Sequence, residues 1–416
     1  MQRFTGLLGI IFILGLSYLF SNNRKAINYR LVLKGLLLQT AIALFILKTD
    51  IGSRIFQKIG VLITRVIEES SRTGADFVFG VLVREEVLSD KLGPGHAFIF
   101  FFNVTATVIL ICVLVGISYH LGIMQRLVSW VARIVHRLMG ISGVEAISNV
   151  ASAFVGQVEA QIMIRPYLKG MTVSELLASM SGSMACIAGG VMVIYMGFGI
   201  PAEYLLAASL MAAPAALVIS KIVYPETHES ETRKNVKLAV EKESSGLLDA
   251  ISRGCSDGLK ISLNISAMLI GFMALVAMIN LFLSWLGPYL AIPDLSMSYI
   301  LGKLFFPLAW LMGVPSKDVD IAGSLMGTKL VINEFVAYLQ LKDLIALRTL
   351  DAKTITILSI ALCGFANIGS IGIQIGGIGE LIPERRKDLA YLAWRALLCG
   401  TLASYLSATI AGLLMY

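Results

Sequence analysis

The sequence predicts an all-α, polytopic membrane protein, and three observations lead to this fold class. The 416 residues have a mean hydropathy of +0.81, with 57% hydrophobic and only 15% charged residues, whereas a soluble domain carries roughly 25% charged residues. Apolar runs long enough for a helix to cross the ~30 Å hydrocarbon core recur from end to end. Two further apolar regions are interrupted by glycine, serine and amide residues. This pattern excludes a soluble enzyme, a disordered chain and a nucleic-acid binder.

Seven segments are expected to span the membrane, at roughly 3–21, 31–49, 97–119, 174–198, 203–223, 258–286 and 387–415. The apolar run 7–20 is interpreted as the first span and not as a cleaved signal, because no small-x-small cleavage site follows it. Between about 50 and 95, charged residues recur at helical spacing. This spacing favours an amphipathic helix that lies in the membrane interface.

The positive charges predict the orientation of the chain. The 34 Lys and Arg residues outnumber the 27 acidic residues, and the surplus lies in short loops with no basic stripe that could follow a nucleic acid. Two clusters flank the spans: Arg24, Lys25, Arg30 and Lys34 near the start, and Arg385, Arg386 and Lys387 near the end. Placing both in the cytoplasm puts the hydrophilic stretch 224–256 there too, with both termini outside.

Cysteine and histidine residues indicate no metal site. The five cysteines form no CxxC pair, and the four histidines form no HExxH motif, so neither a disulfide framework nor a zinc site is expected. We expect no cofactor.

The two interrupted regions, 121–171 and 298–346, begin two copies of one order: a broken hairpin, a broken helix and a full helix. The chain divides into an N-terminal region at 1–120, a first repeat at 121–223, a cytoplasmic loop at 224–257, a scaffold helix with an external loop at 258–297 and a second repeat at 298–416. One intervening span inverts the second copy, and paired Gly-interrupted segments are typical of inverted-repeat transporters. The alternative is that glycines merely allow close helix packing, but this does not explain the acidic and amide residues beside them.

Two glutamates lie in these interrupted regions. Glu159 and Glu334 are expected to be deep in apolar surroundings, each next to an amide, Gln157 or Asn333. An ionised carboxylate inside a bilayer needs a wet cavity, a partner or a proton, and amides with carboxylates suit a neutral, hydrogen-bonding solute. The alternative is simple pairing with a cation, Arg165 for Glu159 and Lys329 for Glu334. Glu145, close to a turn, is more typical of a structural role.

Three motifs in order carry a family resemblance. Residues 149–168 (NVASAFVGQVEAQIMIRPYL) resemble the first re-entrant hairpin of the concentrative nucleoside transporters. Residues 323–338 (GSLMGTKLVINEFVAY) resemble the second hairpin of that family, and residues 362–371 (LCGFANIGSI) resemble its broken seventh helix. The resemblance covers essentially the whole chain.

The resemblance implies a homotrimer in which each protomer has about eight transmembrane helices, two re-entrant hairpins, an interfacial helix and its own nucleoside site. It implies that Gln157 and Glu159 bind the nucleobase, with Val191 beside it. It also implies that Glu334, Asn367 and Ser370 bind the ribose hydroxyls. Phe365 would pack against the nucleoside.

Two residues near the first hairpin tip depart from the family pattern. The family usually has Thr or Ser at the position of Val158, so one hydrogen bond to the base should be missing, which would alter base preference by on the order of 1 kcal/mol. A family proline is also absent, and Gln161 lies in that region instead. Gln161 would either add a polar contact or reshape the hairpin.

A third departure concerns the coupling ion. Sodium-coupled relatives use an Asn and a Ser or Thr where this chain has Ser152 and Cys186, and a thiol is a poor ligand for sodium. Backbone carbonyls near Val155 and Ile187 could still contribute to a sodium site. We therefore expect proton coupling with Glu334 as the proton carrier, and sodium coupling is the alternative.

These observations together predict a secondary active nucleoside importer in a bacterial inner membrane, with the lipid bilayer and a nucleoside as its partners. The alternatives are a passive facilitator, a permease for a related solute such as a free nucleobase, and a membrane-embedded enzyme using the two glutamates. The enzyme would need a nucleophile or metal beside them, which the sequence does not provide.

Overall fold

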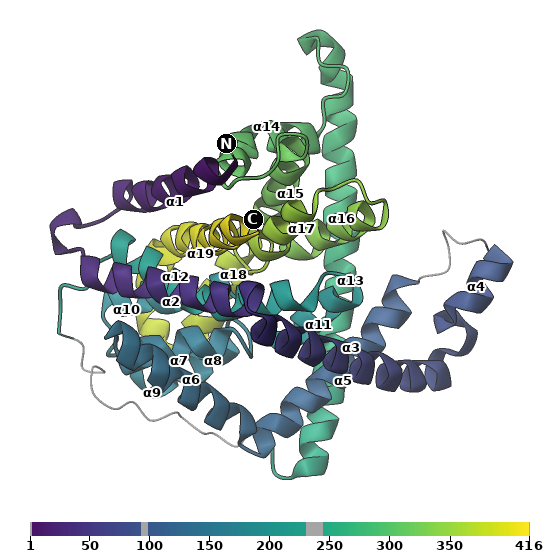
Figure 1. The fold of residues 1–416 in the computed structure, drawn as a ribbon. Helices are drawn as coiled ribbons and strands as arrows, with labels where there is room; N and C mark the ends of the chain where they lie inside the picture. The colour runs from purple at the N-terminus through teal and green to yellow at the C-terminus, as the bar shows by residue number, and fades with distance from the viewer. Residues whose placement is uncertain (1, 93–98, 230–243, 416) are drawn as a thin grey trace.

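The computed structural model describes residues 2–92, 99–229 and 244–415. Within these ranges every regular element is helical (Figure 1), as the sequence predicted. Six of the described helices are long and apolar enough to cross a membrane. They correspond to predicted spans, although residues 97 and 98 of one predicted span lie outside the described ranges.

The N-terminal region contains two of these spans, α2 (Tyr29–Lys48) and α5 (Phe100–His120). The first predicted span forms α1 (Gln2–Leu19), whose apolar part Thr5–Leu19 is shorter than the six spans. The interfacial segment consists of α3 (Asp50–Phe79) and α4 (Glu85–Leu92), and residues 93–95 of the predicted segment lie outside the described ranges. Neither α3 nor α4 is apolar enough to be a span, which agrees with the predicted interfacial position.

The first repeat region contains a helix that the sequence pattern did not separate from the hairpin. This amphipathic helix, α6 (Ile123–Met139), precedes the hairpin helices α7 (Gly143–Ser152), α8 (Glu159–Ile162) and α9 (Arg165–Leu168). The broken helix follows as α10 (Val173–Ala185) and α11 (Gly189–Gly197), and then α12 (Ala202–Val223).

The second repeat region has the same order. Helix α14 (Met297–Leu311) precedes the hairpin helices α15 (Val319–Val331) and α16 (Glu334–Ala346). The broken helix consists of α17 (Ala352–Ala361) and α18 (Ile368–Leu381), and α19 (Arg386–Leu414) closes the chain. The two regions are joined through α13 (Leu247–Leu286), which extends beyond the other helices in Figure 1.

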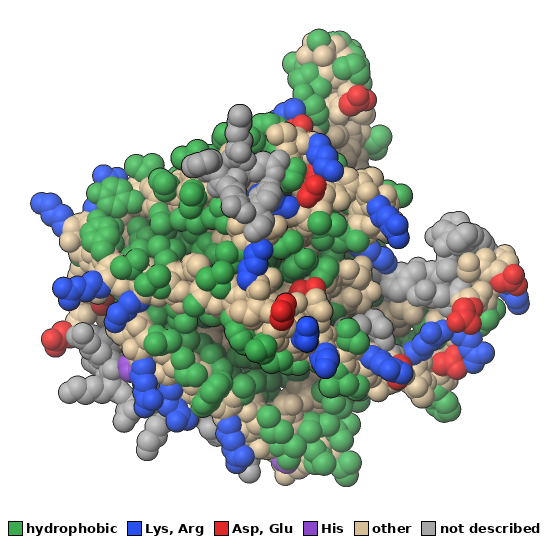
Figure 2. Space-filling model, viewed as in Figure 1, with side chains coloured by type: hydrophobic (Ala, Val, Ile, Leu, Met, Phe, Trp, Pro, Cys, Tyr) green, Lys and Arg blue, Asp and Glu red, His purple; other side chains and the backbone are tan. Residues whose placement is uncertain are grey.

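Glycines let α13 lie directly against α5. A Cβ atom on Gly254 would be 2.7 Å from the Cα atom of Val113, and one on Gly258 would be 2.5 Å from the Cα atom of Ile109. Small residues permit such close approach of membrane helices. The rest of α13 exposes large apolar side chains, among them Ile270. Hydrophobic side chains also cover much of the face shown in Figure 2, as expected of a surface that contacts lipid or another subunit.

The loops expected on one side of the membrane do lie together. The backbone N–H of Asn22 donates to the Val223 carbonyl at 2.8 Å, and this bond joins the first loop to the end of α12. Lys169 and Glu384 form an ion pair at 3.2 Å, which joins the first hairpin to the start of the last span. The two basic clusters therefore share one end of the molecule, as predicted. Gly6 packs against Leu413, so the two terminal helices meet away from this end.

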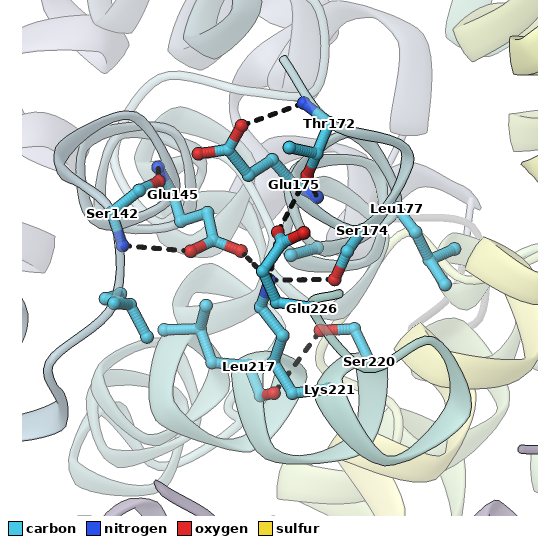
Figure 3. Close-up of polar contacts among 12 residues, drawn as sticks. Ser142, Glu145, Thr172, Ser174, Glu175, Leu177, Leu217, Ser220, Lys221 and Glu226 are labelled. Carbon is cyan, nitrogen blue, oxygen red and sulfur yellow. Dashed lines mark hydrogen bonds and ion pairs between the residues drawn. The ribbon is translucent and has the colours of Figure 1, made fainter. Parts of the chain in front are cut away.

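A polar cluster at this end holds the first repeat together (Figure 3). Helix α7 begins with a capping box between Ser142 and Glu145, and α10 begins with one between Thr172 and Glu175. The buried Lys221 of α12 forms an ion pair with Glu145 and donates to the Ser174 hydroxyl at 2.8 Å. Glu145 therefore has the structural role that the sequence suggested.

Removing one member of this buried pair should be costly. Lys221→Met is expected to lower the free energy of unfolding by about 3–5 kcal/mol, because Glu145 would stay buried without its countercharge. Thermal unfolding of the detergent-purified protein measures this. The control Lys303→Met removes a pair with Asp320 in which both side chains are more than half exposed, and it should cost about 1 kcal/mol or less. Equal melting temperatures for the two variants would contradict the assignment.

Candidate solute-binding site

The breaks in the two broken helices meet. Helix α10 ends at Ala185 and α17 ends at Ala361, and beyond these ends the Phe365 amide donates to the Cys186 carbonyl at 3.1 Å. Gly364 has a φ of +148°, and a Cβ atom there would lie 2.7 Å from the Ala185 carbonyl oxygen. Only glycine fits this crossing, because a side chain would meet the opposite backbone.

The tip of the first hairpin lies beside this crossing. The Gly189 amide, at the start of α11, donates to the Phe154 carbonyl at 3.1 Å. Gly156 has a φ of +129°, and a Cβ atom there would lie 2.5 Å from Oε2 of Glu159. The glutamate side chain therefore folds back over the glycine of the tip.

Two side chains of this tip reach helix α18. Nε2 of Gln157 donates to the Ser370 hydroxyl at 3.2 Å, and Val158 packs where Gly377 leaves room for it. The Oε1 atom of Gln157 is buried and has no hydrogen-bond partner among the residues that the structure describes. A buried acceptor of this kind is available to a donor from a solute.

The second hairpin presents Glu334 to the same place. Asn333 caps α16 by accepting from the Val336 amide at 2.9 Å, so Glu334 lies in the first turn, where the helix dipole favours a negative charge. Its side chain is only 6% exposed. Nδ2 of Asn367 donates to Oε2 of Glu334 at 3.1 Å, and the Tyr195 hydroxyl lies 3.4 Å from Oε1.

A continuous series of contacts therefore joins the two hairpins. Gln157 contacts Ser370, the Ser370 amide donates to Oδ1 of Asn367 at 2.9 Å, and Asn367 contacts Glu334. These four residues are predicted site residues, and they come from both hairpins and one broken helix. Tyr195 adds the other broken helix. The structure thus brings together residues that are up to 213 positions apart in the sequence.

The remaining predicted residues lie around this series. Val191 in α11 and Phe365 at the crossing are both half-buried. Glu159 is exposed, whereas the sequence pattern predicted that it would be deep in apolar surroundings. This expectation does not hold for this residue, because hydropathy describes the neighbours of Glu159 in sequence and not how the folded hairpin covers its side chain.

The alternative pairing of Glu334 with Lys329 does not occur. The Lys329 side chain is fully buried, and its Nζ atom donates to the Ala361 carbonyl at 2.7 Å, at the end of α17. Among the described residues, Glu334 has no basic nitrogen within 4.0 Å. Its contacts with Asn367 and Tyr195 are with neutral groups.

Tyr195 is a site residue that the sequence pattern did not reveal. Its ring is fully buried and packs on Tyr338 with centroids 4.2 Å apart and on Phe335 with centroids 5.8 Å apart. The available signal was its spacing, because Tyr195 follows Val191 by one helical turn and is therefore on the same face of α11.

Of the candidate ion ligands, the Ser152 hydroxyl and the Cys186 carbonyl already have hydrogen-bond partners. The Ser152 hydroxyl donates to the Ser148 carbonyl at 2.7 Å, and the Cys186 carbonyl accepts from Phe365. The Val155 amide donates to the Ala151 carbonyl at 3.0 Å, and Ile187 is buried. Across the described ranges, no three His, Cys, Asp or Glu side chains gather as a ligand set for a metal ion.

Comparisons with known proteins agree with this architecture. Three family models match in succession: the Na+ dependent nucleoside transporter N-terminus at residues 8–82, nucleoside recognition at 101–202, and the Na+ dependent nucleoside transporter C-terminus at 204–412. The nucleoside permease NupC of Helicobacter pylori is 36% identical over 401 residues, which are 96% of this chain and 94% of the permease. Sodium/nucleoside cotransporter 1 of Mus musculus is 38% identical over 99% of this chain and 64% of its own length.

The fold is also shared with a solved structure, that of CNTnw in an inward-facing substrate-bound state. The TM-score is 0.93 at 39% identity, and the match covers 99% of this chain and 98% of the other. These proteins are membrane transporters and not enzymes. The chain belongs to the concentrative nucleoside transporter family.

Proposed function

We propose that this chain imports nucleosides across a bacterial inner membrane by secondary active symport with protons. The observation that carries the proposal is the environment of Glu334, which is buried, is held by two neutral donors and has no basic nitrogen of the described residues within 4.0 Å. A carboxyl group in such a place can exist in its protonated form, and it can release the proton when its partners change.

The nucleoside would enter the series of contacts between the hairpins. Vicinal ribose hydroxyls can donate to Glu334 and accept from Asn367, and Ser370 can do both. Gln157 and Glu159 would face the base beside Val191, and Phe365 would cover the nucleoside. The Oε1 atom of Gln157, which has no partner within the described part of the chain, could accept a hydrogen bond from the base. A bound solute would replace bonds that these side chains make to one another.

The coupling ion is proposed from the candidate sodium ligands. The Ser152 hydroxyl is already bonded within its own helix, and the other position carries the thiol of Cys186. Thiols suit soft metals, whereas sodium requires hard oxygen ligands. These features support proton coupling over sodium coupling. No other cofactor is proposed.

The proposed mechanism is alternating access in a homotrimer. Both hairpins, both broken helices and the helices that follow them would move together against a scaffold formed by α5 and α13. The close glycine-lined packing of α5 on α13 supports a rigid scaffold. The exposed apolar face of α13 supports contacts between subunits.

Uptake into proteoliposomes tests the coupling ion. An inward proton gradient is expected to drive accumulation of labelled uridine or adenosine above the outside concentration, with sodium replaced by choline. A protonophore should abolish this accumulation. If a sodium gradient drives accumulation at equal pH while a proton gradient does not, the chain is a sodium symporter. Equilibration without accumulation would indicate a passive facilitator.

The role of Glu334 can be tested by removing its proton. Glu334→Gln is expected to abolish accumulation and leave assembly intact, because the amide keeps the size of the side chain but cannot carry a proton. The oligomeric state is checked by size-exclusion chromatography with light scattering. Glu384→Gln, which alters an exposed pair with Lys169, is the control and should transport normally. Accumulation by Glu334→Gln at the wild-type level would refute the role.

Base preference can be tested at Val158. Val158→Thr keeps the shape that fits against Gly377 and adds a hydroxyl, so it is expected to change the preference between uridine and adenosine by about fivefold. Competition for labelled uptake by a panel of nucleosides measures this. Val193→Thr, one of the buried positions in the same membrane region, serves as the control. An unchanged panel for Val158→Thr would place this residue away from the base.

A further inference from the structure

The side chain of Gln161 bridges helix α8 to helix α10. It is completely buried. Its Oε1 atom accepts from the Ser179 hydroxyl at 2.7 Å, and its Nε2 atom donates to the Ser183 hydroxyl at 2.9 Å. The amide therefore uses both its acceptor and one donor on two successive turns of α10.

The bridge continues into the other arm of the first hairpin. The hydroxyl oxygens of Ser183 and Ser152 are 2.9 Å apart, and Ser152 donates to the Ser148 carbonyl. Because Ser152 gives its proton to that carbonyl, Ser183 must donate to Ser152 while accepting from Gln161. The hydrogen bonds thus run in one direction from Gln161 through α10 to α7, and every member is neutral.

This bridge is important because the tip has little structure of its own. Helix α8 has four residues and its N-cap makes no side-chain hydrogen bond, and a helix this short is not stable by itself. Gln157 and Glu159 precede Gln161 by four and two residues, so the position of the bridge fixes the turn that carries them.

We propose that Gln161 is a positioning residue for solute recognition. Its amide ties the tip of the first hairpin to α10, so that Gln157 and Glu159 are presented to the solute without a bound cation. The Ser152 hydroxyl, which was expected to contribute to an ion site, instead forms hydrogen bonds within this bridge. This inference rests on the proposed function for its solute, although the bridge itself is independent of it.

The test compares Gln161→Leu with Gln39→Leu. Both remove a fully buried amide that bonds to a serine, since Nε2 of Gln39 donates to Ser407 at 2.7 Å between α2 and α19. Gln161→Leu is expected to raise KM for uridine uptake roughly five- to tenfold with little change in maximal rate, because the polar partners lose their bonds. Gln39→Leu should leave KM unchanged. Wild-type KM should be equal in sodium and choline.

Hydrogen exchange gives a readout that needs no solute. Gln161→Leu should speed exchange of the amides at 153–162, whereas Gln39→Leu should not. In a double-mutant cycle, adding Ser183→Ala to Gln161→Leu should lower the free energy of unfolding less than Ser183→Ala lowers it in the wild type. If Gln161→Leu does not fold, Ser179→Ala, which removes one donor to Oε1, should show the same changes to a smaller degree.

The outcomes separate the two ideas. If the wild type transports no nucleoside but the tip exchanges faster in Gln161→Leu, the proposed function fails and the bridge stands. If the wild type transports nucleosides and Gln161→Leu keeps both its KM and its exchange rates, the positioning role is wrong. A wild-type KM that falls in sodium would refute the cation-free tip.

Discussion

The hydrogen bond from the Phe365 amide to the Cys186 carbonyl is the contact around which the site is built. A helix that breaks inside a bilayer exposes backbone groups that lipid cannot satisfy, so each break needs a partner made of protein, water or solute. Here one break supplies the donor and the other the acceptor of a hydrogen bond, and the Gly189 amide satisfies the Phe154 carbonyl of the first hairpin. Irregular backbone from three segments is thereby gathered at one depth, where polar side chains can also be accommodated.

Asparagine caps extend this arrangement from backbone to side chains. Asn333 and Asn367 each use their side-chain oxygen to cap the helix that follows, α16 or α18. Since the oxygen of Asn367 is committed to the helix, its amide nitrogen is directed outward and donates to Glu334. Two helix N-termini and one carboxyl group therefore meet with complementary polarity, which agrees with the broken-helix sites of other transporters.

Much of this could be predicted from the sequence, and the limits have physical causes. Spans follow from hydropathy, and Glu334 and Asn367 stand out because polar residues are costly in an apolar segment. Tyr195 was missed, and a polar contact of Gln161 was only one of two alternatives, because both depend on packing between different segments of the chain. The exposure of Glu159 depends on how the hairpin tip packs in the fold, which residue composition does not reveal.

The contrast between charged and neutral contacts explains how one fold can be stable at its end and still change its contacts at the solute-binding site. The Glu145–Lys221 ion pair lies at the end of the bundle. Because breaking it would leave a buried charge, the pair stabilises this end of the fold. Within the described residues, the contacts of Gln157, Ser370 and Asn367 include no basic group, and a hydrogen bond between neutral groups has a net value of only about 0.5–1.5 kcal/mol. A solute can replace such hydrogen bonds one for one and then dissociate. A buried ion pair at the same place would instead keep the two hairpins bound to each other.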